Sequence, residues 1–505
     1  MRTLNLVRLA AVLAALGWMS FIAADWRPFT GIAADAPPEE MAARLDDVLD
    51  RAMQRYSIAG VAAGALRDGE VIWSARRGEA QANGSPVTGE TAFNLGSISK
   101  PVTVWAVLAL ARDGRIDLDA PIQPYLARFS LPESEFDVSG VTVRRLLQHV
   151  AGINVHGYGG YSPEEDQPAD IVELSQTYEP LQLVREPGTD PSYSGGGYVL
   201  LQMMVEDVTG QTFDAYVRDQ VFAPLGMDHS GFVEAELPTR SAAFNYYRRE
   251  ITDLRDVALA AAGVYMSGDD MEAFLRAHLD GGGVLPMSWL DQAFAPSEGT
   301  PGIGMSYTRL ETPRGLLIGH GGNNSSWNAR IYIRPETGDG FYFMTNATSG
   351  AQLDFDLSCA WLSAAREMPV EQVCDEAYEL THQISLAAGL AGLLAILAAY
   401  WLFAGLAAGR RRFACPPRAR GPIVLTVRLL LCVVSAIGAG IAVWIFYTNS
   451  VMWRTEVILI DEMPVDEFEQ LLPAVLAVLI LLALSLWSSP PKRAVRPAPA
   501  VAQQV

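Results

Sequence analysis

Residues 93–100 read FNLGSISK, and this octapeptide places a serine and a lysine three positions apart. An apolar stretch at helical spacing follows over 101–113, so we expect Ser97 at or near the start of a helix. Residues three apart share one helix face, which brings the Ser97 hydroxyl and the Lys100 amine together. A lysine that loses its proton can activate a serine, or it can hold a neighbouring base in its ionised form. A serine that only caps an exposed helix would fit the same four letters.

The lysine count agrees with the chemical interpretation. The chain has 37 basic residues, and only Lys100 and Lys492 among them are lysines. A compositional bias toward arginine explains the other basic positions. Arginine cannot deprotonate in proteins, so a site that needs a titratable amine has to keep its lysine. Position 100 is therefore a candidate catalytic position.

Two further motifs carry groups that suit the same chemistry. Residues 191–198 read PSYSGGGY, and the phenol of Tyr193 can act as base on the nucleophile and as acid on the leaving group. Residues 320–323 read HGGN and follow a predicted strand. Glycines on an edge strand let a substrate backbone approach, and N–H groups there can complete an oxyanion hole with Ser97. A Gly-rich turn with a packing tyrosine and a polar strand end are the structural alternatives.

Strand signals lie at both ends of the region around these motifs. An Asp-Gly pair separates two apolar runs and indicates a β-hairpin. Helical patterns fill the long middle, so we expect an α/β sandwich whose sheet is built from both ends of the domain. The predicted strands cover 60–66, 71–75, 315–319, 328–333 and 340–346, and a further helix covers 198–208.

The order of these motifs resembles that of the penicillin-recognising serine hydrolases, which include class C β-lactamases, D-alanyl-D-alanine peptidases and related esterases. FNLGSISK resembles the nucleophile segment of that family. Three other family segments are matched by LLQHVAGI at 146–153, FAPLGM at 222–227 and AGVYMS at 262–267. The resemblance covers about residues 45–350 and implies a β-lactamase/transpeptidase-like sandwich, with an antiparallel sheet and a helical domain.

The resemblance also implies roles for single residues. Ser97 would be the acylated nucleophile, Lys100 and Tyr193 would handle the proton, and the N–H groups of Ser97 and Asn323 would form the oxyanion hole. Two positions depart from the family pattern, because Gly195 replaces an asparagine and His320 replaces a lysine. A neutral histidine is a poorer anchor for a substrate carboxylate. The residues that we expect to bind substrate are Asn323, His320, Gly322, Ser194 and Asn324. No cofactor and no metal are expected.

Apolar and charged segments outside this region predict a membrane-bound, exported protein. The arginine-rich loop after the first C-terminal apolar run and the basic tail are expected in the cytoplasm of a bacterium, which puts the catalytic domain in the periplasm. The predicted organisation is a signal peptide or N-terminal anchor at 1–24, a linker at 25–40, the periplasmic serine hydrolase domain at 41–381, three transmembrane helices at 384–408, 423–447 and 471–487 within 382–490, and a cytoplasmic tail at 491–505.

Charge and cysteine content limit the partners further. A net charge of -20 argues against nucleic acid, because phosphate binding needs a basic surface. Cys359 and Cys374 fall in the oxidising compartment, where they either form a disulfide or stay apart. Their spacing offers no metal pattern. The sequence leaves the oligomeric state open.

The layout of an exported hydrolase followed by three membrane helices resembles the membrane-bound peptidases that mature nonribosomal peptide prodrugs such as colibactin. That resemblance implies removal of an acylated D-asparagine cap, with Asn323 or Asn324 reading the amide, at a membrane where lipid-capped substrate collects. A cell-wall D,D-peptidase, a β-lactamase-like hydrolase or an esterase is the alternative in the same chemical class. A β-lactam-sensing receptor is the alternative from another class, although its cytoplasmic parts would be too short for a folded output domain.

Overall fold

The structure is a computed structural model, and it describes residues 36–364 almost completely and the flanking regions in short pieces. The described residues are 9, 11–17, 31–33, 36–158, 160–162, 165–177, 179–232, 237, 239–245, 247–252, 255–312, 314–324, 326–364, 374, 390, 393, 396–397, 399–410, 412–413 and 488–489. The chain divides into two compact units, and the larger one comprises Thr30–Glu371 with Arg454–Met463.

A six-stranded antiparallel sheet forms the centre of the larger unit. Its strand order is β2-β1-β10-β9-β8-β7, so strands from the two ends of the domain lie side by side. This confirms the expected sandwich with a sheet built from both ends. The strands are β1 (Gly60–Arg67), β2 (Glu70–Gly78), β7 (Thr308–Thr312), β8 (Gly315–Asn324), β9 (Trp327–Arg334) and β10 (Asp339–Thr345).

The hairpin between β1 and β2 follows from its turn residues. Asp68 and Gly69 both have positive φ, at 53° and 80°. Two successive residues with positive φ match the right-handed twist of the flanking strands, and Asp-Gly accepts this conformation at low cost. The sequence therefore predicts this turn from local chemistry alone.

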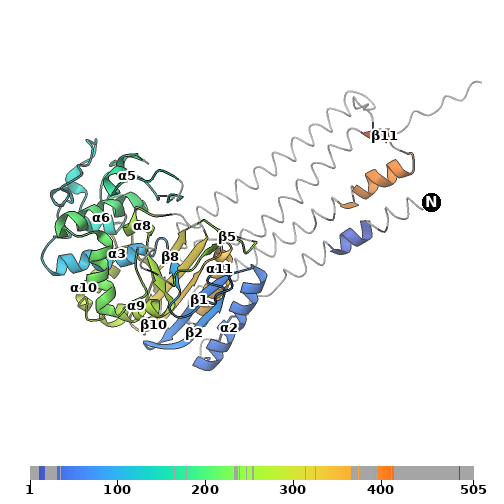
Figure 1. Cartoon of the computed structure of the whole chain (residues 1–505), viewed down its shortest axis with the longest axis horizontal. Coiled ribbons are helices and arrows are strands. Elements are labelled where there is room, and N and C mark those ends of the chain that lie inside the picture. The colour runs from blue at the N-terminus through green and yellow to red at the C-terminus, as the bar shows by residue number, and fades with distance from the viewer. Residues whose placement is uncertain are drawn as a thin grey trace, which may run out of the picture. The chain divides into compact units, whose positions relative to one another are not determined.

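Alternation along β9 divides the side chains between the two faces of the sheet. Ile331 and Ile333 enter the main hydrophobic core. Tyr332 instead stacks on Trp361 of α11 (Gly350–Ala364), with ring centroids 5.8 Å apart. Arg330 reaches Asp354 of the same helix at 2.6 Å, so a buried ion pair joins this face to α11. Figure 1 shows α11 and α2 (Pro38–Arg55) together on one side of the sheet.

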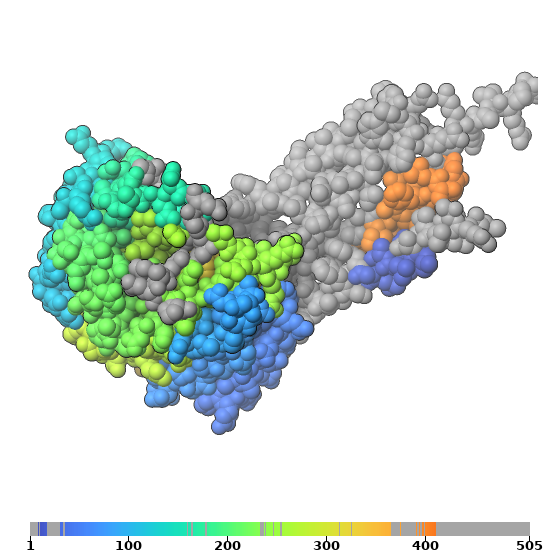
Figure 2. All heavy atoms as spheres, in the orientation of Figure 1, coloured from blue at the N-terminus to red at the C-terminus, as the bar shows by residue number. Residues whose placement is uncertain are grey.

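The other face carries the helical part of the unit, and the two parts form one continuous body in Figure 2. Its central helix, α3 (Ser99–Arg112), is buried along almost its whole length, which explains its nearly uniform apolar sequence. The remaining helices are α4 (Val143–Leu147), α5 (Ile171–Thr177), α6 (Gly195–Thr209), α7 (Phe213–Val217), α8 (Leu259–Ala262), α9 (Gly268–Asp280) and α10 (Met287–Phe294), with short 3₁₀ or π turns at Gln123–Tyr125, Val138–Gly140, Arg218–Phe222 and Ala223–Leu225.

Two small two-stranded sheets complete the larger unit. β3 (Ala92–Asn94) pairs with β6 (Tyr265–Ser267), and β4 (Ala243–Phe244) pairs with β5 (Glu250–Ile251). Strand β3 contains the first two residues of the FNLGSISK segment, Phe93 and Asn94. It places that segment beside the AGVYMS segment, which the sequence separates from it by more than 160 residues.

The second unit comprises Met1–Phe29, Gln372–Trp453 and Pro464–Val505. Its described parts include helical residues 11–17 and 399–407 and a short pairing of β11 (Arg412–Phe413) with β12 (Ser488–Ser489). Within the described residues, no helix has both the length and the apolar character needed to cross a membrane. The predicted spans at 423–447 and 471–487 lie outside those residues, as does much of 384–408. All three therefore stay predictions.

The two cysteines of the predicted disulfide are both in the disulfide-bonded state. Cys359 is buried in α11, and Cys374 is buried as well. The pairing of these two residues with each other stays a prediction.

Candidate active site

Ser97 lies in a turn between β3 and α3, two residues before the helix begins. Gly96 before it has a φ of 48°, which a residue with a side chain adopts only at a cost. Ser99 stabilises the turn, because its hydroxyl donates to the Gly96 carbonyl at 2.6 Å and accepts from the Val264 N–H at 2.9 Å. The nucleophile segment is thus held on the AGVYMS segment by side-chain and backbone bonds.

Lys100 sits on the first turn of α3 and is buried, with 2% of its surface exposed. Its Nζ donates to Ser97 Oγ at 3.1 Å and to the Ala261 carbonyl at 2.8 Å. Burial lowers the pKa of Lys100 to about 7, while the charge of Asp256 acts in the opposite direction. A lysine with such a pKa is partly a free amine at neutral pH, and it already touches the hydroxyl that it would deprotonate.

The ring of Tyr193 lies beside the pair formed by Ser97 and Lys100. The Lys100 Nζ lies 4.6 Å from the centre of the Tyr193 ring and 5.6 Å from that of Tyr198. Tyr193 precedes α6, whose first turn contains three glycines, and Gly196 packs so closely on Asn154 that a Cβ there would meet its carbonyl at 2.6 Å. The Gly-rich motif therefore positions Tyr193. The three residues that the sequence predicts to be catalytic come together in the structure.

His149 is a part of the site to which the sequence assigned no role. Its ring lies 4.4 Å from the Tyr193 ring, and its Nδ1 accepts the Ser194 N–H at 3.1 Å. Burial and then the charge of Lys100 hold the pKa of His149 well below its ordinary value, so the ring is neutral. The segment LLQHVAGI contains this histidine, which is the signal that could have identified it.

Strand β8 forms the opposite wall of the site. The predicted strand stops at Gly319, but β8 continues to Asn324 because its pairing with β9 extends to Asn324 and Trp327. HGGN is therefore part of the strand. A Cβ on Gly322 would meet the Leu95 carbonyl at 1.9 Å, and one on Gly96 would meet the Asn323 carbonyl at 2.6 Å. These glycines let the strand contact the nucleophile turn.

The side chains expected to bind substrate differ in what they contact. Asn323 donates from Nδ2 to Asn328 Oδ1 at 3.0 Å across the strand pair. Asn324 donates to Asp256 at 3.0 Å, and His320 lies 6.3 Å from Tyr193 between ring centres. The Ser194 hydroxyl accepts from the Gly197 N–H and donates to the Asn154 carbonyl, so it caps α6. Substrate contacts by these side chains stay predictions.

We expect Gly322→Ala to lose about 10²-fold or more in kcat. The added methyl group collides with the Leu95 carbonyl, so either β8 or the nucleophile turn has to move. Such a movement displaces the Asn323 N–H from the predicted oxyanion hole, and loss of one donor there costs this much. Steady-state hydrolysis of a short ester measures the effect.

Gly340→Ala is the matched control for this change. Gly340 lies in β10 of the same sheet, but an added Cβ there meets its nearest atom at an ordinary 3.5 Å. We expect the control to keep the activity of the parent protein. Parent-level activity in Gly322→Ala would contradict the position of β8 in the oxyanion hole.

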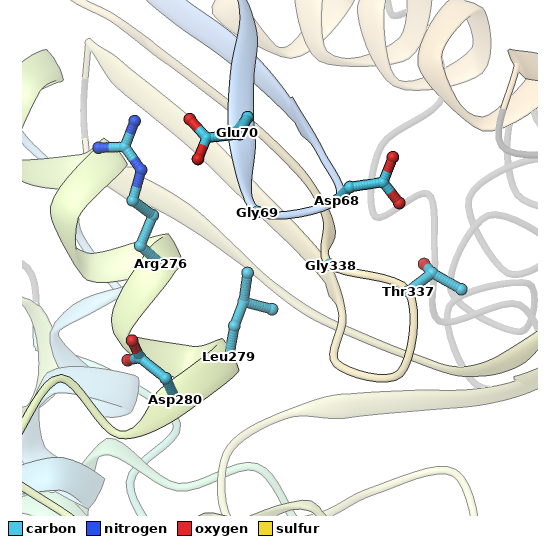
Figure 3. A pocket seen from close by; sticks show the side chains of 8 residues that line it. All are labelled: Asp68, Gly69, Glu70, Arg276, Leu279, Asp280, Thr337 and Gly338. Atoms are coloured by element: carbon cyan, nitrogen blue, oxygen red, sulfur yellow. The ribbon is translucent and has the colours of Figure 1, made fainter.

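A separate pocket lies at the far turns of the sheet (Figure 3). Its walls come from the β1–β2 turn, the β9–β10 turn and the end of α9, and they include Glu70 and Arg276. None of the three predicted catalytic residues lines it. The predicted reacting groups lie at the Ser97 turn and on β8, and none of the residues that line this pocket belongs to either element.

Comparison with known proteins gives consistent matches over the catalytic region. The model of the beta-lactamase family matches residues 45–365. Esterase EstB of Burkholderia gladioli is 30% identical over 310 residues, covering 53% of this chain and 79% of the esterase. Penicillin-binding protein 4 of Amycolatopsis lactamdurans is 28% identical over 252 residues, covering 48% of this chain and 64% of that protein.

Among solved structures, the octameric penicillin-binding protein homologue from Pyrococcus abyssi is similar with a TM-score of 0.56. The match covers 65% of this chain and 79% of that chain at 22% identity. At this identity the likeness concerns the fold, which is the sheet and helical part described above.

Proposed function

Because the chain belongs to the beta-lactamase family of serine hydrolases, we propose that it is a membrane-anchored periplasmic amidase or peptidase. Its substrate is an acyl-D-amino-acid cap of the D-Asn type, which it removes from a nonribosomal peptide prodrug. The observation that carries the hydrolase mechanism is the contact of the buried Lys100 amine with Ser97 Oγ, with the Tyr193 ring beside both.

The reaction proceeds through an acyl-enzyme. The free amine of Lys100 takes the proton of the Ser97 hydroxyl as Oγ attacks the scissile carbonyl. The N–H groups of Ser97 and Asn323 stabilise the oxyanion. Tyr193 donates a proton to the departing nitrogen and is reprotonated from Lys100. Water then attacks the acyl carbonyl, loses its proton to the same pair of residues and restores the Ser97 hydroxyl.

The charges around the nucleophile support an amide-capped substrate over a substrate with a free carboxylate. His320 stands at the position where the penicillin-recognising serine hydrolases carry a lysine. The half-buried Asp256 adds a negative charge near Lys100. Arg330 is the nearest cation on β9, and it is buried against Asp354. The negative charge of Asp256 would repel a substrate carboxylate near Lys100, whereas it would not repel a neutral amide.

Membrane anchoring in this proposal rests on the apolar runs at 384–408, 423–447 and 471–487, on the basic loop and tail, and on the N-terminal apolar segment. A catalytic domain held at the membrane would meet acylated substrates that collect in the lipid.

Esterase activity is a second candidate function. It is favoured by the match to an esterase at 30% identity, which covers 79% of that enzyme. The same acyl-enzyme chemistry cleaves an ester more easily, since an alkoxide leaves without prior protonation of nitrogen. A cell-wall D,D-peptidase, a β-lactamase-like hydrolase and a β-lactam-sensing receptor are tested alongside it.

The deciding experiment incubates the membrane-embedded full chain with four probes, namely an acyl-D-Asn amide, an acyl-D-Ala-D-Ala peptide, a short ester and a penicillin. Mass spectrometry identifies the products. We expect preferential cleavage of the acyl-D-Asn amide, with an acyl-L-Asn amide as the matched control that is not cleaved. Faster cleavage of acyl-D-Ala-D-Ala would reject the prodrug substrate. Stable acylation by penicillin without turnover of any probe would favour the receptor.

A further inference from the structure

A carboxylate that no sequence motif marks lies beside the catalytic lysine. Asp256 is half-buried in the segment that precedes α8. Its charge favours the protonated form of Lys100. Helix α8, which begins three residues after Asp256, supplies the Ala261 carbonyl that accepts from Lys100 Nζ. One stretch of chain thus contacts the lysine through a carbonyl and acts on it through a charge.

One amide group joins Asp256 to the rest of the site. Asn324 Nδ2 at the end of β8 donates to Asp256 Oδ2 at 3.0 Å and to Asn94 Oδ1 at 3.2 Å. Asn94 Oδ1 also accepts the Gly96 N–H at 2.9 Å. A hydrogen-bonded chain therefore runs from the carboxylate through β8 to the residue before Ser97.

This hydrogen-bond network links the two elements whose relative position has to be kept during catalysis. The N–H groups of Ser97 and Asn323 belong to different segments, the nucleophile turn and β8. The glycines at 96 and 322 permit close contact between these segments, but glycine itself does not hold them together. The bonds of Asn324 to Asn94 and Asp256 supply that restraint, and preorganised donors are what an oxyanion hole requires.

We propose that Asp256 is a positioning residue of the hydrolytic site, which acts through Asn324 on the end of β8 and through its negative charge on Lys100. This inference deepens the proposed function and rests on its acyl-enzyme mechanism. Asp256 touches neither the nucleophile nor the scissile bond in it.

The electrostatic part of the proposal concerns a small set of groups. Burial favours the neutral amine of Lys100, and Asp256 opposes that effect. Loss of the Asp256 charge therefore lowers the pH at which Lys100 takes up its proton, and the acidic limb of the activity profile moves to lower pH. Around Lys100 the other titratable or charged groups include Tyr193, Tyr198, His149, His156, His320 and Arg255. Asp256 also lines a pocket that it shares with Arg128, Asp170, Glu206, Asp207 and Asp214.

The lysine content allows this titration to be measured directly. The chain has only two lysines, so the full chain labelled with ¹³C at lysine Cε gives two lysine signals in detergent micelles. The Lys492→Arg variant assigns them. We expect Lys100 to titrate near pH 7 in the parent protein and at lower pH in Asp256→Asn. Because this readout needs no substrate, it is independent of which compound the enzyme cleaves.

Two variants separate the charge from the hydrogen bond. Asp256→Asn removes the charge, and its amide oxygen can still accept from Asn324. Asn324→Ala removes the bond and leaves the charge. We expect Asn324→Ala to lose roughly tenfold or more in kcat on a short ester, with little change in KM and no change in the Lys100 titration. Asp219→Asn changes an exposed carboxylate and is the control that leaves both readouts unchanged.

An unchanged Lys100 titration in Asp256→Asn would overturn the proposal, and so would parent-level turnover in Asn324→Ala. Thermal unfolding of each variant checks that the domain remains folded, and Asn324→Leu, which keeps a side chain of similar size but cannot donate a hydrogen bond, replaces Asn324→Ala if that variant fails to fold. Failure of the proposed function would look different. The acyl-D-Asn amide would then stay intact while ester turnover and the Lys100 titration still responded as described.

Discussion

Ser97→Ala is expected to abolish hydrolysis, with a loss on the order of 10⁴- to 10⁶-fold in kcat. The change removes the oxygen that forms the acyl-enzyme, and groups that act as a unit lose nearly all of their effect when one is removed. Ser97 Oγ accepts a hydrogen bond from Lys100 but carries no bond that the turn depends on. The domain should therefore keep its fold and its melting temperature.

Two measurements test this expectation. A fluorophosphonate probe should label the parent protein on the peptide that contains Ser97, and the variant should stay unlabelled. Ser139→Ala, which changes a serine in an exposed 3₁₀ turn, should be labelled like the parent. Turnover or labelling retained in a folded Ser97→Ala protein would reject the acyl-enzyme mechanism.

Lys100→Arg is expected to lose about 10²- to 10⁴-fold in kcat although the positive charge is conserved. The guanidinium cannot give up its proton at any pH that the protein tolerates, so no base remains next to Ser97. Burial sets the pKa of Lys100 to about 7, which makes the wild-type amine available as the pH rises through neutrality. The parent protein should therefore show an acidic limb near pH 7 in kcat/KM, and the variant should show none.

The chain provides a matched control for this change. Lys492 is the only other lysine, and it lies in the predicted cytoplasmic tail. Lys492→Arg should keep the activity and the pH profile of the parent protein. If Lys100→Arg also did so, the lysine would not act as a titrating base, and Tyr193 would have to remove the Ser97 proton alone.

The sequence predicted those parts of the fold that local patterns specify. The Asp-Gly hairpin, the apolar helix after Ser97 and the returning strands follow from turn chemistry and periodicity, and each is present in the structure. The strand that contains HGGN was predicted too short. Its glycines give no local strand signal, and only pairing with β9 extends β8 to Asn324.

The three candidate catalytic residues could be proposed from the sequence because each lies in a short motif that suits the same chemistry, and the structure brings them together. Asp256 and His149 were not assigned roles. Asp256 lies in a segment without a motif, and its role depends on a contact with Asn324, 68 residues away in sequence. His149 lies in a quoted segment, but its packing against Tyr193 arises from folding across 44 residues of chain.

By itself, the sequence determined which groups can react. An S-x-x-K spacing at the turn into a helix lets an amine reach the hydroxyl three residues before it, and a chain with one lysine in 41–381 leaves no other candidate for that amine. The tertiary structure decided how those groups are tuned. Burial of Lys100 lowers its pKa, two glycines bring β8 onto the nucleophile turn, and Asn324 connects that strand to Asp256. These effects depend on dehydration and on contacts between distant segments, neither of which a local pattern of residues encodes.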